Sequence, residues 1–197
     1  MLIVGPAISA GPLFLRRYVD DPHLLVSTPR LVPFAHDYAH GDSEPWHQHD
    51  CAQLLHILSG VVRVDTPVGY WVVPPGRGVW LPAGTPHALR VTGQVAARTL
   101  FIDPLARADL PSSCQIVQIT PLLRELIVTS LALAERYQPG SRDERIYELI
   151  LDEIRGMAVL PFACWSPGAR RCAVYVTRCG KCRGKPGAAS RRRKRAI

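Results

Sequence analysis

Between residues 31 and 119 the sequence is a series of short apolar segments separated by turns, and no other feature constrains the possible folds as strongly. The segments are rich in valine, leucine and aromatic residues and cover residues 52–58, 61–66, 70–73, 78–81, 87–92 and 95–102. The turns between them contain glycine or proline: Ser59-Gly60, Pro67-Val68-Gly69, Pro74-Pro75-Gly76 and Pro82-Ala83-Gly84. Short strands with turns at this spacing predict an antiparallel sandwich or barrel.

After this region the apolar residues recur at helical spacing instead. Thr120 precedes a proline and is placed as the N-cap of a first helix over residues 121–137. Ser141 and Glu144 have the spacing of a capping box, in which each side chain accepts a hydrogen bond from a backbone N–H of the other residue. A second, amphipathic helix is therefore expected to reach about residue 160. The pattern predicts an antiparallel helix pair after the β domain, and an apolar stripe left exposed on it would suit a dimer contact.

Charge divides the chain near residue 160. Residues 1–160 carry 13 arginines, no lysine and all 16 acidic residues, a net charge of −3, whereas residues 161–197 carry 8 arginines, 3 lysines and no acid, a net charge of +11. Four of the six cysteines also lie in the second part: Cys164, Cys172, Cys179 and Cys182. The overall charge of +8 therefore belongs to a basic, cysteine-containing tail, which we expect to be unstructured, and it does not indicate a nucleic-acid-binding domain.

The first 29 residues are expected to form a weakly structured arm. Their apolar start is interrupted by glycine and proline, and the first positive charges follow it, whereas a signal peptide has its positive charge before the apolar run. No stretch of about 18 residues is free of proline, glycine and charge, so no membrane span is expected. The sequence thus predicts a cytoplasmic protein in four parts: an arm (1–29), a barrel (30–119), a helical hairpin (120–160) and a tail (161–197).

The strongest local signal is His47-Gln48-His49, with Cys51 and Gln53 after it. In one extended strand these alternate residues would face the same side. His87 forms a second histidine site after a turn rich in proline and glycine. Three imidazoles that converge inside a barrel commonly hold Fe, Mn, Ni, Cu or Zn. The other four histidines have no such pattern and are expected at the surface or satisfied in the interior: His23, His36, His40 and His56.

Two longer patterns resemble the motifs of the cupin superfamily. The run Gly41-x5-His47-x-His49-x3-Gln53-x6-Gly60 is similar to the first motif, with Gln where that motif has Glu. The run Gly76-x5-Pro82-x-Gly84-x2-His87-x3-Val91 is similar to the second, with Val where that motif has Asn. Cupins are small double-stranded β-barrels (jelly rolls), in agreement with the strand pattern. The resemblance implies metal positions at His47, His49, Gln53 and His87.

Gln53 departs from the cupin pattern at a position that matters for metal binding. A glutamate would supply a negative ligand that offsets the charge of a divalent ion, whereas glutamine offers only a neutral carbonyl oxygen. Two alternatives stay open. The barrel holds one divalent ion, such as Fe, Mn, Ni or Zn, or the same side chains line the barrel and hydrogen-bond one another or an organic ligand.

The sequence around these motifs resembles, more narrowly, the sensor domain of AraC-type transcription regulators. The similarity is carried by residues 47–55, 59–67 and 71–87 and extends over about residues 30–160. In this family the barrel senses a small molecule, the helix pair commonly mediates dimerisation, and a C-terminal pair of helix-turn-helix motifs binds DNA. The resemblance implies a small-molecule effector and a homodimer formed through residues 121–160.

Residues 161–197 are expected to lack the DNA-binding half that this resemblance implies. They are too short for two helix-turn-helix motifs, and their composition is that of a GC-rich coding region read in another frame. Our hypothesis is a frameshift or premature stop after about residue 160. Two alternatives give the tail a role. Its four cysteines could bind zinc, since Cys179 and Cys182 form a usual half-site, or residues 191–195 could bind DNA nonspecifically through their charge.

Taken together, these features predict a non-catalytic module, the ligand-sensing and dimerisation part of an AraC-type regulator without its DNA-binding half. Cys51 is a candidate for the ligand pocket. Trp71 and Trp80 are candidates for the pocket wall, although core packing is the role that the sequence favours for both.

The rival prediction is a small metal-dependent cupin enzyme, such as a dioxygenase or isomerase, in which three histidines leave coordination positions open for substrate and oxygen. Gln53 in the acid position argues against this prediction. No evident acid–base residue accompanies the motifs either, because Glu44 and Asp50, the nearby candidates, are expected to be solvated loop residues.

Overall fold

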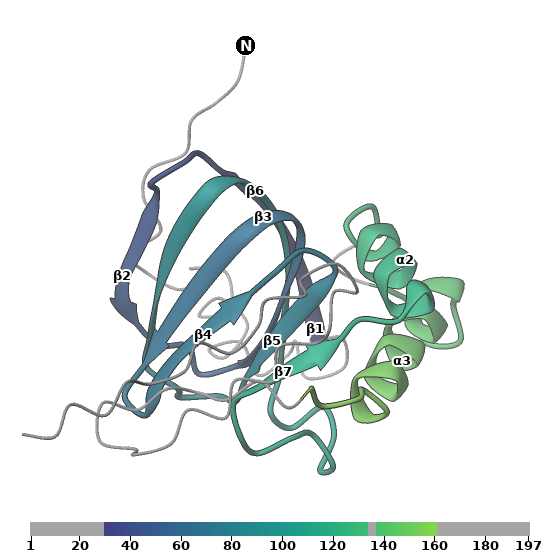
Figure 1. Ribbon diagram of the computed structural model, residues 1–197. Helices are drawn as coiled ribbons and strands as arrows, with labels where there is room; N and C mark the ends of the chain where they lie inside the picture. Colours follow the sequence, from purple (N-terminus) through teal and green to yellow (C-terminus); the bar gives the residue numbers. More distant parts are fainter. Residues whose placement is uncertain (1–29, 134–136, 161–197) are drawn as a thin grey trace, which may run out of the picture.

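The structure of the protein, a computed structural model, describes residues 30–133 and 137–160 (Figure 1). Seven strands in this part of the chain form one antiparallel sheet: β1 (Leu31–Tyr38), β2 (Ser43–His47), β3 (Ala52–Thr66), β4 (Gly69–Val73), β5 (Arg77–Leu81), β6 (His87–Ile102) and β7 (Gln115–Gln118). The predicted arm (1–29) and the predicted tail (161–197), with the frameshift, zinc and nonspecific DNA hypotheses attached to it, lie outside the described residues.

The two longest strands, β3 and β6, pair with each other and hold the other strands. The strand order is β1-β6-β3-β5-β7, with β2 also paired to β6 and β4 to β3. β6 pairs with β2 near its start and with β1 along its second half. The strands curve around a common interior (Figure 1). The predicted mostly β architecture, an antiparallel barrel followed by helices, is confirmed.

The turn that the sequence places at Ser59-Gly60 is not formed, and this prediction is wrong. β3 continues through both residues, and the pairing of β3 with β6 shifts register on either side of Ser59, which identifies a β-bulge. Gly60 has a φ of +75°, and a Cβ at this position would lie 2.4 Å from the carbonyl oxygen of Gln94. Only glycine fits here, because the backbone conformation and the close approach both exclude a side chain.

Two helices follow the sheet, α2 (Pro121–Ser130) and α3 (Arg142–Arg155). The Thr120 hydroxyl accepts a hydrogen bond from the Leu123 N–H (3.0 Å), so the predicted N-cap is confirmed. α2 ends earlier than the predicted end at residue 137. After Ser130 the backbone N–H groups bond three residues back instead of four, which tightens the chain into turns and stops the α-helix.

The capping box at the start of α3 is formed in part. The Ser141 hydroxyl accepts from the Glu144 N–H (3.2 Å), as predicted. The Glu144 carboxylate accepts from the N–H of Gly140 (2.5 Å) instead of that of Ser141, so the reciprocal bond is made one residue earlier. Both bonds satisfy N–H groups at the helix start.

The two faces of the sheet belong to two separate apolar clusters. In β3, Leu55 and Ile57 face the barrel interior, where they pack with Tyr38, Val62, Val64, Val73, Val79, Leu81, Leu89, Val91, Val95, Ala97 and Ile116. Leu54, the residue before Leu55, faces the other side and packs with Trp80, Leu100 and Ile102 of the sheet and with Leu123, Ile127, Tyr147, Ile150, Leu151 and Ile154 of the helices. The inner face thus encloses the interior of the barrel, and the outer face carries α2 and α3.

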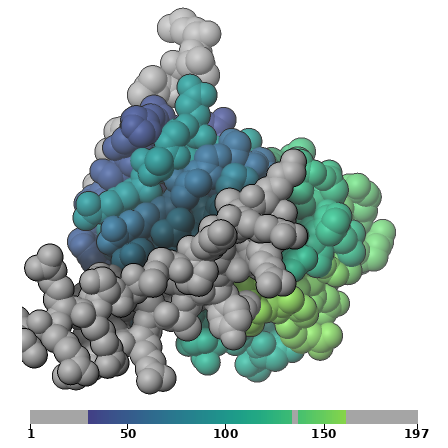
Figure 2. Space-filling model, in the orientation of Figure 1, coloured from purple at the N-terminus to yellow at the C-terminus, as the bar shows by residue number. Residues whose placement is uncertain are grey.

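The helices lie together at one side of the strands (Figures 1 and 2). Beyond α3 the chain returns to the sheet, where the Leu160 N–H donates to the Ile116 carbonyl (2.9 Å) next to β7. The helical segment is therefore tied to the barrel at both ends. Neither α2 nor α3 has the length and apolar character that a membrane-spanning helix requires.

Candidate functional site

His47 and His87 lie opposite each other on neighbouring strands. His47 is the last residue of β2 and pairs with His87, the first residue of β6. Leu89, two residues after His87, belongs to the interior cluster, so His87 faces the barrel interior as well. The ring centroids of His47 and His87 are 4.3 Å apart. His87 is buried (1% exposed), whereas His47 is partly exposed, so the pair extends from the barrel interior towards solvent.

His49 joins this pair from a loop, not from the strand that the sequence predicts. β2 ends at His47 and β3 begins at Ala52, so the expectation of one extended strand through residues 47–53 is wrong. The N–H of Gly84, a glycine of the second motif, donates to the His49 carbonyl (2.7 Å) and holds the loop in place. The His49 ring also packs edge-on against Phe101 (centroids 5.1 Å apart).

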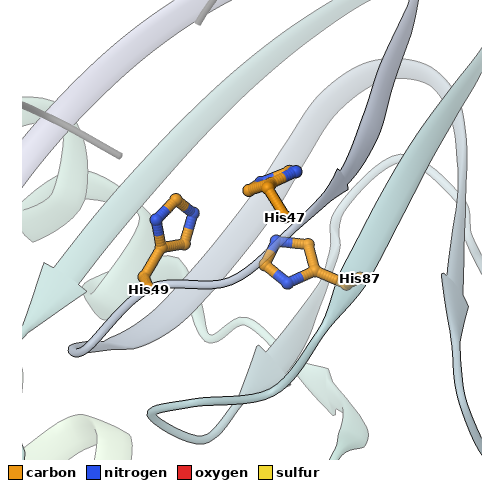
Figure 3. A group of neighbouring side chains, drawn as sticks. All are labelled: His47, His49 and His87. Carbon is orange, nitrogen blue, oxygen red and sulfur yellow. The ribbon is translucent and has the colours of Figure 1, made fainter. Parts of the chain in front are cut away.

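The structure therefore brings together His47, His49 and His87, which we call the histidine triad. Figure 3 shows the three rings gathered where β2 ends and β6 begins. One ligand nitrogen from each ring lies within 4.8 Å of the other two. Two nitrogens bound to one ion at a usual bond length of about 2.1 Å can be at most about 4.2 Å apart. Small side-chain rotations would bring all three nitrogens onto a single ion.

Backbone carbonyls set the tautomers of two triad members. Nδ1 of His47 lies 2.7 Å from the Pro45 oxygen, and Nδ1 of His87 lies 2.8 Å from the Thr85 oxygen. A carbonyl oxygen only accepts hydrogen bonds, so each Nδ1 carries a hydrogen, and in the neutral form of each ring Nε2 has the free lone pair. Nε2 of His87 and Nδ1 of His49 are buried and have no hydrogen-bond partner among the described residues.

Burial keeps two of these imidazoles neutral. It lowers the pKa of His87 to about 4, against the hydrogen bond to Thr85, which acts in the opposite direction. Burial also lowers the pKa of His49 to about 4, and the His47 and His87 rings add to this effect. A neutral imidazole with a free, buried lone pair is the form that binds a metal ion. The triad therefore fits a divalent metal.

Gln53 lies inside the same barrel. It pairs with Leu81 and with Phe101, the residue against which His49 packs. Its Oε1 is buried and has no hydrogen-bond partner among the described residues. A neutral acceptor in this position suits an N–H or O–H group of a bound molecule.

The sequence missed one acidic side chain at the triad. Glu44 is expected to be a solvated loop residue, but it lies in β2 with its side chain only 18% exposed, so this expectation is wrong. Its Oε2 is 3.6 Å from Nε2 of His47, and its Oε1 accepts a short hydrogen bond from the Tyr38 hydroxyl. The physical reason is a register shift between Glu44 and His47, which puts two residues three apart on the same face of the sheet.

The three residues expected at the pocket lie in three different clusters of the structure. Cys51 packs with Val32 and Phe101, and burial raises the pKa of its thiol to about 11, so the thiol stays protonated. Trp71 packs against the interior cluster, and its indole N–H is buried with no hydrogen-bond partner among the described residues. Trp80 is in the outer cluster between sheet and helices, where its N–H donates to the Pro111 carbonyl (2.8 Å).

Comparison with known proteins gives one family match and one curated relative. A family model described as the AraC-like ligand binding domain matches residues 33–150. The HTH-type transcriptional regulator NimR of Escherichia coli (strain K12) is 35% identical over 114 residues, which are 57% of this chain and 41% of that protein. The chain thus matches less than half the length of this regulator.

Solved structures with partial similarity include a cupin superfamily protein from Desulfitobacterium hafniense (19% identity, TM-score 0.36, covering 37% of this chain and 67% of that one). They also include KdgF from Halomonas sp. (22% identity, TM-score 0.37, covering 39% and 72%). A third is the DMSP lyase DddQ from Ruegeria pomeroyi (26% identity, TM-score 0.36, covering 44% and 42%).

Proposed function

The chain belongs to the family of AraC-like ligand binding domains, and from this premise we propose that it is the effector-sensing domain of a transcription regulator, with its ligand site at the histidine triad. The observation that carries the proposal is that two buried nitrogens of the triad, Nδ1 of His49 and Nε2 of His87, have no hydrogen-bond partner among the described residues. Buried polar atoms are normally paired in folded proteins. Unpaired ones that converge on one point favour a bound ion or ligand there.

The group that we propose the histidine triad binds is a divalent metal ion. His47, His49 and His87 would hold it, and a bound ion would supply open coordination positions for an oxygen or nitrogen atom of the effector. Oε1 of Gln53 and the indole N–H of Trp71 support a polar effector, because neither has a hydrogen-bond partner in the part of the chain that the structure describes and each offers one to a bound molecule.

Dimerisation through α2 and α3 is part of the proposal. Most apolar side chains of these helices pack against the sheet. Three large ones remain exposed to solvent: Leu122 (49%), Leu149 (40%) and Val128 (39%). Apolar side chains left in contact with water favour burial against a second copy. We further propose a role in DNA recognition and a cytoplasmic location, because the chain is similar to an HTH-type transcriptional regulator.

A metal-dependent cupin enzyme is the second candidate, and one observation favours it. The sequence suggests that Glu44 is a solvated loop residue, yet in the structure its carboxylate lies 3.6 Å from Nε2 of His47. The two candidates differ in what happens to the bound molecule. An enzyme converts it, whereas a sensor releases it unchanged, so chromatographic analysis of the molecule after incubation with protein and oxygen distinguishes them.

A thermal-unfolding screen tests the sensor proposal. The metal-loaded protein is mixed with a panel of small organic acids, amines and heterocycles. A ligand present at about one hundred times its Kd should raise the Tm by about 5–10 °C. The shift should be absent in His87→Ala and retained in His40→Ala, since the exposed His40 lies outside the triad. A ligand that stabilises the wild type and His87→Ala equally would place the effector site elsewhere.

A further inference from the structure

The cupin motif has a glutamate at the position of Gln53, so the histidine triad has no negative charge from that position. A different residue of the barrel carries a carboxylate close to the triad. Residue 53 is glutamine, so three neutral imidazoles alone would leave the full charge of a divalent ion uncompensated in a largely buried site. Separation of such a charge from water is costly unless an opposite charge lies close by. Glu44 is the carboxylate that the structure puts next to His47.

The fold directs Glu44 into the barrel by means of an irregularity in β2. Glu44 pairs with Leu89 and His47 pairs with His87, so three steps along β2 match two steps along β6. Leu89 is part of the interior cluster and shares its face with His87. In a regular strand Glu44 and His47 would point to opposite sides, and the register shift makes both point inwards.

Tyr38 fixes the orientation of this carboxylate. The Tyr38 hydroxyl donates a short hydrogen bond to Oε1 of Glu44, which leaves Oε2 facing His47. Burial raises the pKa of Tyr38, and the Glu44 charge adds to this effect, so the hydroxyl keeps its proton and remains a donor. Second-layer hydrogen bonds of this kind commonly orient the ligands of a metal ion.

The distance between Glu44 and His47 suits two ligands of one ion. Oε2 of Glu44 is 3.6 Å from Nε2 of His47, longer than a hydrogen bond. Two ligand atoms at about 2.1 Å from a common ion are separated by about 3.0 to 4.2 Å, depending on the angle between them. The observed separation from His47 falls inside this range. Glu44 is not among the residues whose ligand atoms all lie within 4.8 Å of one another, so its side chain must turn towards His49 and His87 to share their ion.

We propose that Glu44, not residue 53, supplies the anionic ligand to a divalent ion held by the histidine triad, and that Tyr38 positions it. This inference rests on the metal site of the proposed function. The site is then a three-histidine, one-carboxylate centre whose acid comes from a different strand than the motif position. The alternative for the same geometry, an ion pair between Glu44 and a protonated His47 without any metal, is one outcome of the test.

The test is calorimetric titration of the metal-free protein with Zn²⁺, followed by visible absorption of the Co²⁺ complex as a report on the ligand set. Glu44→Gln should weaken Zn²⁺ binding at least about tenfold and alter the Co²⁺ spectrum. Tyr38→Phe should weaken binding about three- to tenfold and leave the spectrum close to that of the wild type. Glu125→Gln, which changes an exposed carboxylate on α2 that pairs with Arg124, should have no effect.

A rescue experiment separates lost ligation from lost structure. The double variant Glu44→Gln/Gln53→Glu moves the carboxylate to the motif position and should recover most of the affinity lost in Glu44→Gln. Unchanged Zn²⁺ affinity in Glu44→Gln, or a larger loss in Gln53→Leu than in Glu44→Gln, would overturn the role of Glu44 and leave the triad site intact. Failure of the wild type to bind Zn²⁺ or Co²⁺ would overturn the metal site itself.

Discussion

At the scale of single residues, the chemistry of the site depends on backbone carbonyls two positions before a histidine. Pro45 and Thr85 each accept a hydrogen bond from the Nδ1–H of the histidine that follows, and both segments contain a proline that limits the backbone. The motif spacing identified all three triad residues. It could not identify the tautomers, because they depend on where the chain turns before each histidine.

A buried histidine outside the triad behaves differently from the prediction. His56, expected at the surface or satisfied in the interior, is fully buried on the outer face of the sheet, and only its Nδ1 has a partner, the Arg77 carbonyl (3.1 Å). Nε2 has no hydrogen-bond partner among the described residues. Burial lowers the pKa of His56 below 6.5, against the hydrogen bond to Arg77, and the Arg124 and Arg98 charges add to the lowering.

This histidine makes the folded state less stable in acid. The unfolded chain binds a proton at His56 near pH 6.5 and the folded chain does so only at lower pH, so the free energy of unfolding falls as the pH drops below about 6.5. Chemical denaturation of the wild type and of His56→Leu between about pH 7.5 and about pH 5 measures the effect. The stability advantage of the wild type over the variant should shrink towards low pH, and a constant difference would show that His56 titrates alike in both states.

At the scale of secondary structure, the type of each element was predictable and its irregularities were not. Local sequence was enough to predict the N-cap of α2 and most strands. Thr120 caps the helix that directly follows it, and the apolar pattern of a strand depends on the residues of that strand alone. The bulge at Gly60 and the register shift in β2 depend on pairing with β6, which is distant in sequence. The role of Glu44 follows from that register shift and was therefore missed.

Gly60 should be the least replaceable glycine of the barrel. Gly60→Ala adds both backbone strain and a clash with Gln94, and it should lower the free energy of unfolding by about 3 kcal/mol or more. Gly93→Ala is the matched control, because Gly93 also has a positive φ (+81°) but open space around its Cβ position, and it should cost about 1 kcal/mol. Denaturant unfolding measures both values, and equal costs would refute a steric role for the Gln94 contact.

At the scale of the whole molecule, the sheet separates the proposed ligand site from the proposed dimer helices. Its inner face encloses the triad, and its outer face packs against α2 and α3 through Leu54, Trp80 and their neighbours. This arrangement places the proposed ligand site and the proposed dimer helices on opposite sides of the same strands. Ligand binding could then change the helices only through small movements of the sheet, with different ligand affinity in two states of the domain.

The dimer is tested by a charge placed on the helices. Leu122→Asp puts a carboxylate at an apolar position of α2 that is 49% exposed, and it should raise the dimer dissociation constant at least about tenfold. Val72→Asp, at a 50% exposed position of β4 in the barrel, is the matched control and should leave the dimer unchanged. Sedimentation equilibrium gives both constants. A wild type that is monomeric throughout, or a larger effect of Val72→Asp, would contradict a dimer formed through these helices.

The central claim is that the histidine triad forms a metal-binding site inside the barrel, and elemental analysis tests it directly. Wild type, His40→Ala and His87→Ala are incubated with Fe²⁺, Mn²⁺, Ni²⁺ or Zn²⁺ and then dialysed. We predict close to one equivalent of one of these metals per chain in the wild type and in His40→Ala, and less than about a tenth of that amount in His87→Ala. Metal retained by His87→Ala at the wild-type level, or no metal in the wild type, would contradict the claim.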